Sequence, residues 1–345
     1  MPRRLDATDP ADREAALTLA VAALRAGGVV AFPTETVYGL GARARDASAV
    51  EKVYALKGRP PWHPLIVHLG DAEMMDDWAC VPEVARRLAE AHWPGPLTMV
   101  LRALPGVPSN VTGGAPTVAL RVPSHPLALE LLRALGEGVA APSANRYGRV
   151  SPTRAEHVVA EFEDTPSEGD AALLVLDGGP CAVGLESTIV DLSGASPRLL
   201  RPGGIPASAL AAVVGPFTSA RGAAGGAERG AERPPAPGDR PRHYSPDVPT
   251  RIVAAAELAF APPDVAVLAM RAAPPTRSEG AAPWLELGFD ASSYARDLYA
   301  ALRSLEASRP SAIWVEKVPT AEPWRAVADR LGRASGNPPQ PEEST

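Results

Sequence analysis

Cysteine is scarce in this sequence of 345 residues, which contains only Cys80 and Cys181. Neither cysteine belongs to a CxxC pair or another metal-ligand spacing, so we expect two reduced thiols that pack in the core, and no zinc site. No apolar run approaches the ~20 residues that a transmembrane helix needs. The first twelve residues mix Pro, Arg and Asp and lack the apolar stretch of a signal peptide. These features predict a cytoplasmic protein.

Several common catalytic motifs are also absent from the sequence. It contains no Walker A loop, no GxSxG nucleophile elbow and no HExxH zinc pair. Gly39, Gly41 and Ala44 satisfy GxGxxA, but Pro33 separates them from the preceding predicted strand, and no second strand ends in an acid at the required distance. We therefore reject a dinucleotide fingerprint, and any ATP chemistry must use a different phosphate cradle.

Positive charge is not concentrated anywhere in the chain. The formal net charge is −6, and the 34 Lys and Arg residues are scattered among acids. A protein that holds nucleic acid by bulk electrostatics needs clustered cations. We therefore expect no strong direct nucleic-acid binding, whereas a small anionic ligand is compatible with this composition.

Apolar residues make up 46% of the chain, and proline is abundant, with 39 residues. The length exceeds the ~250–300 residues at which a single core usually stops growing, so two domains are expected. A first helix is capped by Asp9, begins near Pro10 and ends at Gly27. Strand patterns occur at 29–32, 65–69, 97–101, 117–122, 173–176 and 187–192, and further helical patterns at 47–56, 82–93, 126–135 and 153–162. This irregular alternation predicts an α/β (α+β) fold with a mixed sheet.

A change of composition separates this region from the rest of the chain. Residues 215–242 are rich in Gly, Ala, Pro, Arg and Glu and have no apolar periodicity, which is typical of a linker. Strand patterns at 251–254, 265–270 and 312–315 follow, with amphipathic helical patterns at 292–305 and 323–331. The second part is therefore predicted to be a smaller α/β domain.

Polar residues cluster where strands or helices end. The segment PTETVYGLG at 33–41 carries two hydroxyls, a carboxylate and glycines after the first strand, which suits a ligand-binding loop as well as a plain turn. The segment KGRPPWHPLIVH at 57–68 places Lys57 and Arg59 two residues apart at a helix end. These cations would either meet a polyphosphate or complement the helix dipole.

Four more clusters follow along the chain. TVALRVPSHP at 117–126 places Thr117, Ala119 and Arg121 on one strand face, where the arginine needs an anionic partner, either a substrate carboxylate or a structural ion pair. APSANRYGRVSPT at 141–153 ends another strand, and Ser151 or Thr153 would either bind phosphate at a helix start or simply cap the helix. GLESTIVD and RPGG complete six polar clusters in one domain.

In this order, the six segments resemble the YrdC-like threonylcarbamoyl-AMP synthase family over about residues 13–206. His243-Tyr244-Ser245-Pro246 is similar to the interdomain motif of its two-domain members. The resemblance implies a YrdC-like twisted mixed sheet with a deep, positively lined groove at 13–206, a linker with the HYSP motif at 207–249 and a Rossmann-like α/β domain at 250–335. The implied reaction joins L-threonine, bicarbonate and ATP into threonylcarbamoyl-AMP and pyrophosphate, for the threonylcarbamoyladenosine modification of tRNA next to the anticodon.

The resemblance also implies roles for individual residues. The predicted threonine contacts are Thr36, His68, Arg121, Ala141 and Ser187. The predicted ATP contacts are Arg59, His63, Thr117, Ser143, Ser151, Arg201 and Tyr244. Lys57 and Arg59 would supply positioning and charge, with no obvious general base or covalent nucleophile. Mg²⁺ is expected to be held mainly by ATP, with no metal ligands from the protein, and the product would pass to a tRNA threonylcarbamoyl-transfer complex.

Two other functions compete with this interpretation. A related enzyme that forms a carbamoyl-adenylate from carbamoyl phosphate would carry zinc-binding cysteines or an added transfer domain, and neither pattern occurs here. A non-catalytic RNA-binding module would need basic patches and aromatic platforms. For Tyr244, the resemblance favours a lid over the ATP, and an anchor for the second domain is the alternative.

Overall fold

The computed structural model describes residues 1–166, 173–217, 244–275 and 277–336. The chain forms two compact units. The first comprises Met1–Tyr147, Pro152–Ala182 and Glu186–Asp239, and the second comprises Gly148–Ser151, Val183–Leu185 and Arg240–Thr345. Most of the predicted linker lies outside the described residues.

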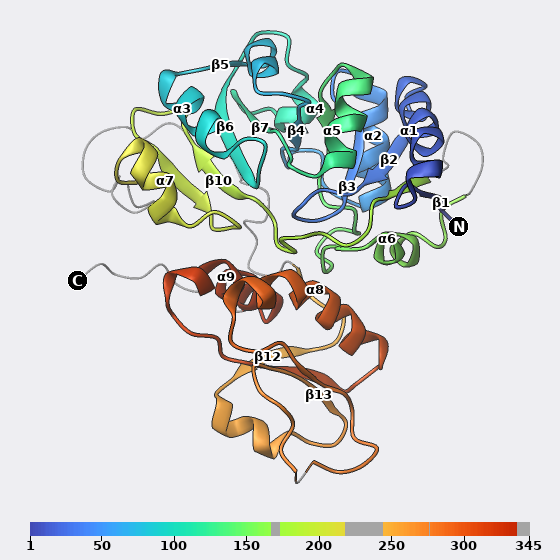
Figure 1. Cartoon of the computed structure of the whole chain (residues 1–345), viewed down its shortest axis with the longest axis vertical. Coiled ribbons are helices and arrows are strands. Elements are labelled where there is room, and N and C mark those ends of the chain that lie inside the picture. Colours follow the sequence, from blue (N-terminus) through green and yellow to red (C-terminus); the bar gives the residue numbers. More distant parts are fainter. Residues whose placement is uncertain (167–172, 218–243, 276, 337–345) are drawn as a thin grey trace. The chain divides into compact units, whose positions relative to one another are not determined.

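A mixed sheet of eleven strands forms the centre of the first unit (Figure 1). Its order is β1-β9-β2-β3-β8-β4-β7-β6-β10-β11, and β5 pairs with β6. The strands are β1 (Arg3–Asp6), β2 (Val29–Phe32), β3 (Gly39–Arg43), β4 (Ile66–His68), β5 (Ala79–Cys80), β6 (Leu97–Ala103), β7 (Thr117–Arg121), β8 (Val139–Ala140), β9 (Leu173–Asp177), β10 (Thr188–Asp191) and β11 (Arg198–Arg201). The predicted mixed sheet is confirmed, although β1, β3, β5 and β11 were not foreseen.

Helices surround this sheet, with α1 and α5 beside each other at one end and α3 and α7 at the other (Figure 1). Asp9 caps α1 through the amide of Ala11, as predicted. Helix α2 ends at Lys57, and Gly58 takes a left-handed conformation with φ of 61°. The helices are α1 (Pro10–Arg25), α2 (Ala47–Lys57), α3 (Glu83–His92), α4 (Ser109–Thr112), α5 (Pro126–Leu135), α6 (Ala155–Glu161) and α7 (Ala207–Val214), with a 3₁₀ turn η1 (Glu73–Asp77).

Two local predictions are wrong. Helix α6 begins at Ala155 with Arg154 as its N-cap, so neither Ser151 nor Thr153 caps it. Cys181 is a buried free thiol, but Cys80 is exposed because it lies in the short strand β5, which pairs only with β6.

Side chains alternate between the two faces of the sheet, so the pairing register shows which residues share a face. Val67, Met99 and Leu120 point to one face and pack with residues of α3 and α7, such as Leu88 and Leu210. The opposite face carries His68 and Arg121, and we call it the site face. Over β2, β3 and β8, residues of α1 and α5 pack on the site face. Farther along, its apolar cluster contains strand residues only: Ile66, Val100, Ala119, Ile189 and the half-buried Leu200.

The second unit is built on a parallel sheet of order β12-β15-β13-β14. This confirms the predicted small α/β unit, whose strand β14 and turn η2 were not foreseen. Its elements are β12 (Thr250–Val253), η2 (Ala255–Phe260), β13 (Val265–Ala269), β14 (Trp284–Glu286), α8 (Ala291–Ala307), β15 (Ala312–Glu316), η3 (Glu322–Trp324) and α9 (Arg325–Ala334).

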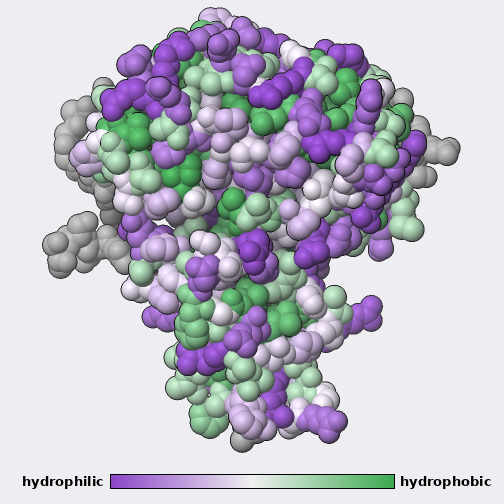
Figure 2. Space-filling model, viewed as in Figure 1, coloured by the Kyte–Doolittle hydropathy of each residue, from purple (hydrophilic) through white to green (hydrophobic). Residues whose placement is uncertain are grey.

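On the visible surface, hydrophilic side chains are interspersed with small hydrophobic groups (Figure 2). The large hydrophobic side chains that are exposed, including Trp62, Phe260 and Phe289, are far apart in the sequence. Single exposed apolar residues of this kind are common in globular proteins. Within the described part of the chain, no helix is long and apolar enough to cross a membrane.

Candidate active site

Strand β7 carries residues from both predicted substrate sets on the site face. Thr117, Ala119 and Arg121 alternate along it, and Ala119 and Arg121 lie opposite Ile66 and His68 of β4. Thr117 at the start of the strand is partly exposed, whereas Arg121 at its end is buried. The four residue steps between them span about 13 Å. The predicted ATP contact Thr117 and the predicted threonine contact Arg121 are therefore separated by the apolar cluster around Ala119.

Arg121 contacts the loop between β2 and β3. Its Nη1 donates to Thr36 Oγ1 at 2.9 Å, and its Nη2 lies 2.8 Å from Glu35 Oε1 in an ion pair. Thr34 holds the loop, because its Oγ1 donates to the carbonyl of Val37 at 2.6 Å and accepts from the amides of Thr36 and Val37. The structural ion pair considered from the sequence is thus present, and it lies beside the predicted threonine contact Thr36.

His68 is buried beside Arg121. Burial, and then the positive charge of Arg121, lower the pKa of His68 to about 3, so the imidazole is neutral at physiological pH. Its ring meets Phe32 edge to face at 5.9 Å, and its buried Nδ1 has no hydrogen-bond partner. This geometry agrees with a neutral hydrogen-bonding group.

Lys57 points into the first unit, although it is the last residue of α2. Its Nζ donates to the carbonyl of Ser143 at 2.5 Å and also to that of Asn145. Burial, with Arg59 as a further cause, lowers its pKa well below the ordinary value. Lys57 lies in the last turn of α2, so the helix-dipole alternative stays open. Its two hydrogen bonds also join the end of α2 to the segment after β8.

The loop after α2 is held at several points. Arg59 Nη2 donates to the carbonyl of Pro64 at 3.1 Å, and Tyr54 Oη donates to the carbonyl of His63 at 2.8 Å. The ring of His63 meets Tyr147 edge to face at 5.6 Å. Arg59 and His63 are both buried, so this loop is a fixed element of the first unit.

The segment after β8 lies beside the start of β3. Gly39 and Ser143 form an isolated bridge, and the amide of Ala141 donates to the carbonyl of Ile66 at 2.9 Å. Cross-strand pairing therefore places Ala141 beside β4, where it is buried in the apolar cluster that α1 and α5 help to form.

Ser187 links two of the predicted sets. Its hydroxyl lies 2.7 Å from Thr98 Oγ1, and Arg201 Nη2 donates to both the carbonyl and the hydroxyl of Ser187, at 2.9 and 3.1 Å. Arg201 pairs with Ile189 across β10 and β11. The predicted threonine contact Ser187 and the predicted ATP contact Arg201 are thus in direct contact.

Two of the predicted ATP contacts belong to the second unit. Ser151 is fully buried there. Tyr244 is also buried, has a left-handed φ of 58°, stacks on Tyr299 at 6.0 Å and lies under the Arg330 guanidinium at 5.2 Å. The ATP contacts predicted for these two residues stay predictions.

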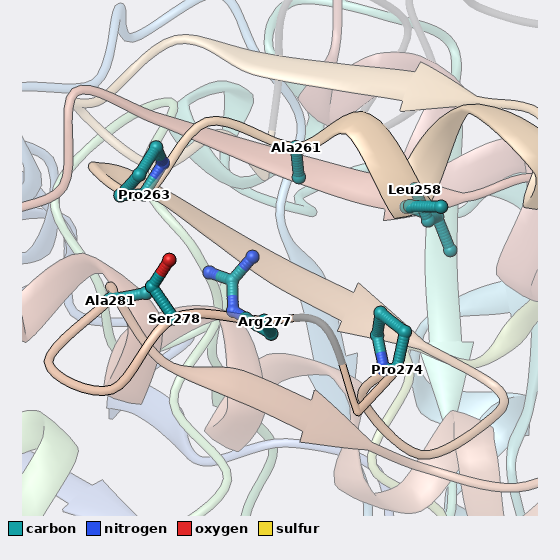
Figure 3. Close-up of a pocket in the computed structure, with 8 residues that line it drawn as sticks. Leu258, Ala261, Pro263, Pro274, Arg277, Ser278 and Ala281 are labelled. Carbon is teal, nitrogen blue, oxygen red and sulfur yellow. The ribbon is translucent and has the colours of Figure 1, made fainter.

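The second unit also contains a pocket between η2 and the loop that joins β13 to β14 (Figure 3). Its lining residues include Ala261, Pro263 and Ser278. Arg277 reaches into it and donates through Nη2 to the carbonyls of Val265 and Ala282, at 2.8 and 2.6 Å. None of the predicted substrate contacts lies in this pocket, and no group of three or more His, Cys, Asp and Glu residues suited to a metal ion occurs among the described residues.

Sequence reasoning missed two residues of this region. Glu35 was noted only as a carboxylate in a loop, and its pairing with Arg121 joins positions 86 residues apart. Thr98 lies among apolar residues near the start of β6, and only the neighbouring Ser187 gives its hydroxyl a partner. A charge between two threonines was the available signal for Glu35, whereas Thr98 gave none.

Comparison with known proteins places this geometry in a family. Residues 22–203 match the Sua5/YciO/YrdC family model, described as telomere recombination, and residues 205–336 match the model described as threonylcarbamoyl-AMP synthase, C-terminal domain. The threonylcarbamoyl-AMP synthase of Bacillus subtilis is 39% identical, with 96% of each chain covered, and that of Pyrococcus abyssi is 37% identical, with 93% of this chain and 94% of the relative covered.

Solved structures agree with these matches. The structure of P. abyssi Sua5 complexed with L-threonine superimposes with a TM-score of 0.83 at 35% identity, covering 97% of this chain and 98% of that one. The two family models match consecutive parts of the chain. The chain therefore belongs to the Sua5/YrdC family of threonylcarbamoyl-AMP synthases, in the form that carries the additional C-terminal domain.

Proposed function

We propose that this chain is an L-threonylcarbamoyladenylate synthase, a nucleotidyltransferase that joins L-threonine, bicarbonate and ATP and releases pyrophosphate. The product would pass to a tRNA threonylcarbamoyl-transfer complex in the cytoplasm. The observation that carries the proposal is the site face, where β7 presents Thr117 and Arg121 on either side of an apolar cluster. The full-length relatives with this name support the same reaction.

Threonine would bind at the Arg121 end of β7. The guanidinium there is suited to the substrate carboxylate, because charge-assisted hydrogen bonds to a planar fork are the stronger kind. Thr36 and Ser187 offer hydroxyls for the side-chain oxygen of threonine, and neutral His68 offers the unpaired Nδ1. The P. abyssi relative in complex with L-threonine supports this choice of substrate.

ATP would bind toward the Thr117 end of β7. Arg59, His63, Ser143 and Arg201 are the proposed contacts in the first unit, and the contacts of Ser151 and Tyr244 stay predictions from the family resemblance. Arg59 and Arg201 suit phosphates, and buried Lys57 fixes the segment of Ser143. Mg²⁺ would screen phosphate charge while bound mainly to the nucleotide and water.

In the proposed reaction the protein mainly positions the reactants and forms no covalent intermediate with them. The threonine amine adds to CO₂ with loss of a proton, or condenses with bicarbonate with loss of water, to give a carbamate. A carbamate oxygen then attacks the α-phosphorus of ATP, and the bond to pyrophosphate breaks. The side chains of the site face would align the two reactants and stabilise the charge that develops on the phosphate oxygens.

Domain limits of 13–206, 207–249 and 250–335 are part of this proposal, and the family matches at 22–203 and 205–336 support a division near residue 204.

The test is an incubation with labelled bicarbonate, L-threonine and ATP, followed by chromatography and mass spectrometry of the nucleotide product. We expect label in a threonylcarbamoyl-adenylate. A parallel incubation contains labelled carbamoyl phosphate and ATP without threonine. If label enters a nucleotide only in that incubation, the carbamoyl-phosphate-dependent reaction is established instead. Binding to RNA without any adenylate product would favour the RNA-binding module.

A further inference from the structure

Glu35 is a buried charged residue of the site region to which the proposed function gives no role. It lies in the loop between β2 and β3, and only 6% of its surface is exposed. Its Oε2 accepts a hydrogen bond from the amide of Ser124 at 3.1 Å, and its Oε1 lies 2.8 Å from Arg121 Nη2. Removing a carboxylate from water is costly unless its oxygens find donors.

The contact between Glu35 and Arg121 is an ion pair without a hydrogen bond. Both atoms that meet, Glu35 Oε1 and Arg121 Nη2, are buried and have no hydrogen-bond partner, despite their separation of 2.8 Å. The other guanidinium nitrogens are directed elsewhere, Nη1 to Thr36 and Nε to the carbonyl of Gly95 at 3.4 Å. An anionic acceptor and a cationic donor therefore lie side by side, paired in charge but each without a hydrogen bond.

The charges of an α-amino acid complement this pair. Its carboxylate is an acceptor that fits Arg121 Nη2, and its amino nitrogen is a donor that fits Glu35 Oε1. These two groups sit on one carbon atom, so they can reach two protein atoms that lie next to each other. The resulting arrangement alternates positive and negative charge, which lowers the electrostatic energy of burying all four groups.

We infer that Glu35 is a substrate contact, which binds the amino nitrogen of threonine while Arg121 binds its carboxylate. This inference rests on the proposed function, because it takes threonine as the ligand of this end of β7. Glu35 then recognises the nitrogen on which the carbamate forms. The protein should therefore bind hydroxy acids, which lack the amino group, more weakly than threonine.

The experiment measures binding of three ligands by ligand-observed NMR titration, a method suited to weak complexes. L-Threonine carries both head groups, 3-hydroxybutyrate lacks the amino group, and threoninol lacks the carboxylate. For the parent protein, we expect 3-hydroxybutyrate to bind at least tenfold more weakly than threonine. Equal affinity of the parent for these two ligands would overturn the inference without any variant.

The variant Glu35→Gln keeps the side-chain shape and removes the charge. A lost charge-assisted hydrogen bond should weaken threonine and threoninol binding by roughly 10- to 100-fold, and 3-hydroxybutyrate binding should change less than threefold. If Glu35 merely orients Arg121, the variant will instead weaken threonine and 3-hydroxybutyrate equally and leave threoninol unchanged, which contradicts the inference.

Asp177→Asn is the matched control. Asp177 is another buried carboxylate of the first unit, paired with Arg4 at 2.5 Å and bonded to Tyr38. The Asp177→Asn variant should alter thermal unfolding but should bind threonine, 3-hydroxybutyrate and threoninol with the affinities of the parent. A parent protein that fails to bind threonine at all would refute the proposed function itself, whereas a parent that binds threonine and 3-hydroxybutyrate alike refutes only the role of Glu35.

Discussion

The neutral state of His68 predicts how stability depends on pH. In the folded protein its pKa is about 3, whereas an unfolded histidine has a value near 6.5. Protonation therefore favours the unfolded chain, and the contribution of His68 is complete above pH 6.5 and declines as the pH falls toward 3. Each pH unit below 6.5 should lower the free energy of unfolding by about 1.4 kcal/mol, which amounts to about 2 kcal/mol at pH 5.

The assay compares the parent with His68→Gln, whose side chain does not titrate. Urea unfolding followed by circular dichroism at pH 8 and pH 5 gives two free energies for each protein. The variant should be less stable than the parent at pH 8, because it loses the contact with Phe32. Its loss between pH 8 and pH 5 should nevertheless be smaller than the parent's by about 2 kcal/mol. The same loss in both proteins would show that His68 is not buried in its neutral form.

Three further predictions concern the substrates. Arg59→Ala and Arg201→Ala should each raise the KM for ATP at least tenfold, because charge-assisted phosphate contacts contribute about 1.5–3 kcal/mol. Both variants should retain the parent's circular dichroism spectrum. Unchanged kinetics would leave both residues with structural roles only. Serine should have a kcat/KM roughly 10–200-fold below that of threonine if a pocket fits the methyl group, and equal values would show that no such pocket exists. Tyr244→Phe keeps the stacking on Tyr299 and removes only the hydroxyl, so a raised KM for ATP would indicate a nucleotide contact, and an unchanged KM would make Tyr244 an anchor of the second unit.

The elements with strong local patterns could be predicted from the sequence. Helix α1 has its N-cap at Asp9, and the left-handed Gly27 follows its C-cap Ala26. The alternation of Thr117, Ala119 and Arg121 correctly assigned one face of β7. Strand β3 was missed because its glycines resemble a loop. Gly41 is required there for packing, since a Cβ atom would come within 2.6 Å of Phe32 and 2.7 Å of Val139. Strand β1 was missed because its sequence, RRLD, has no apolar run and its pairing with β9 joins distant parts of the chain.

The site was predictable as a set of motifs but not as a geometry. Motif order indicated Arg121 and Ser187, yet their partners Glu35 and Thr98 come from segments 86 and 89 residues away. Pairing at such separations depends on how the strands order themselves in the sheet. One sequence contains no direct signal for that order, which is why the ion pair of Arg121 was left as one of two alternatives.

The central claim is tested most directly by asking whether pyrophosphate is released only when ATP, threonine and bicarbonate are all present. The purified chain would be incubated with ATP and Mg²⁺, and release would be followed with a coupled pyrophosphatase assay as threonine and bicarbonate are omitted in turn. The proposed reaction, in which the carbamate of threonine attacks ATP, predicts release only when both threonine and bicarbonate are present. Undiminished release without threonine, or with carbamoyl phosphate in place of bicarbonate, would contradict the account.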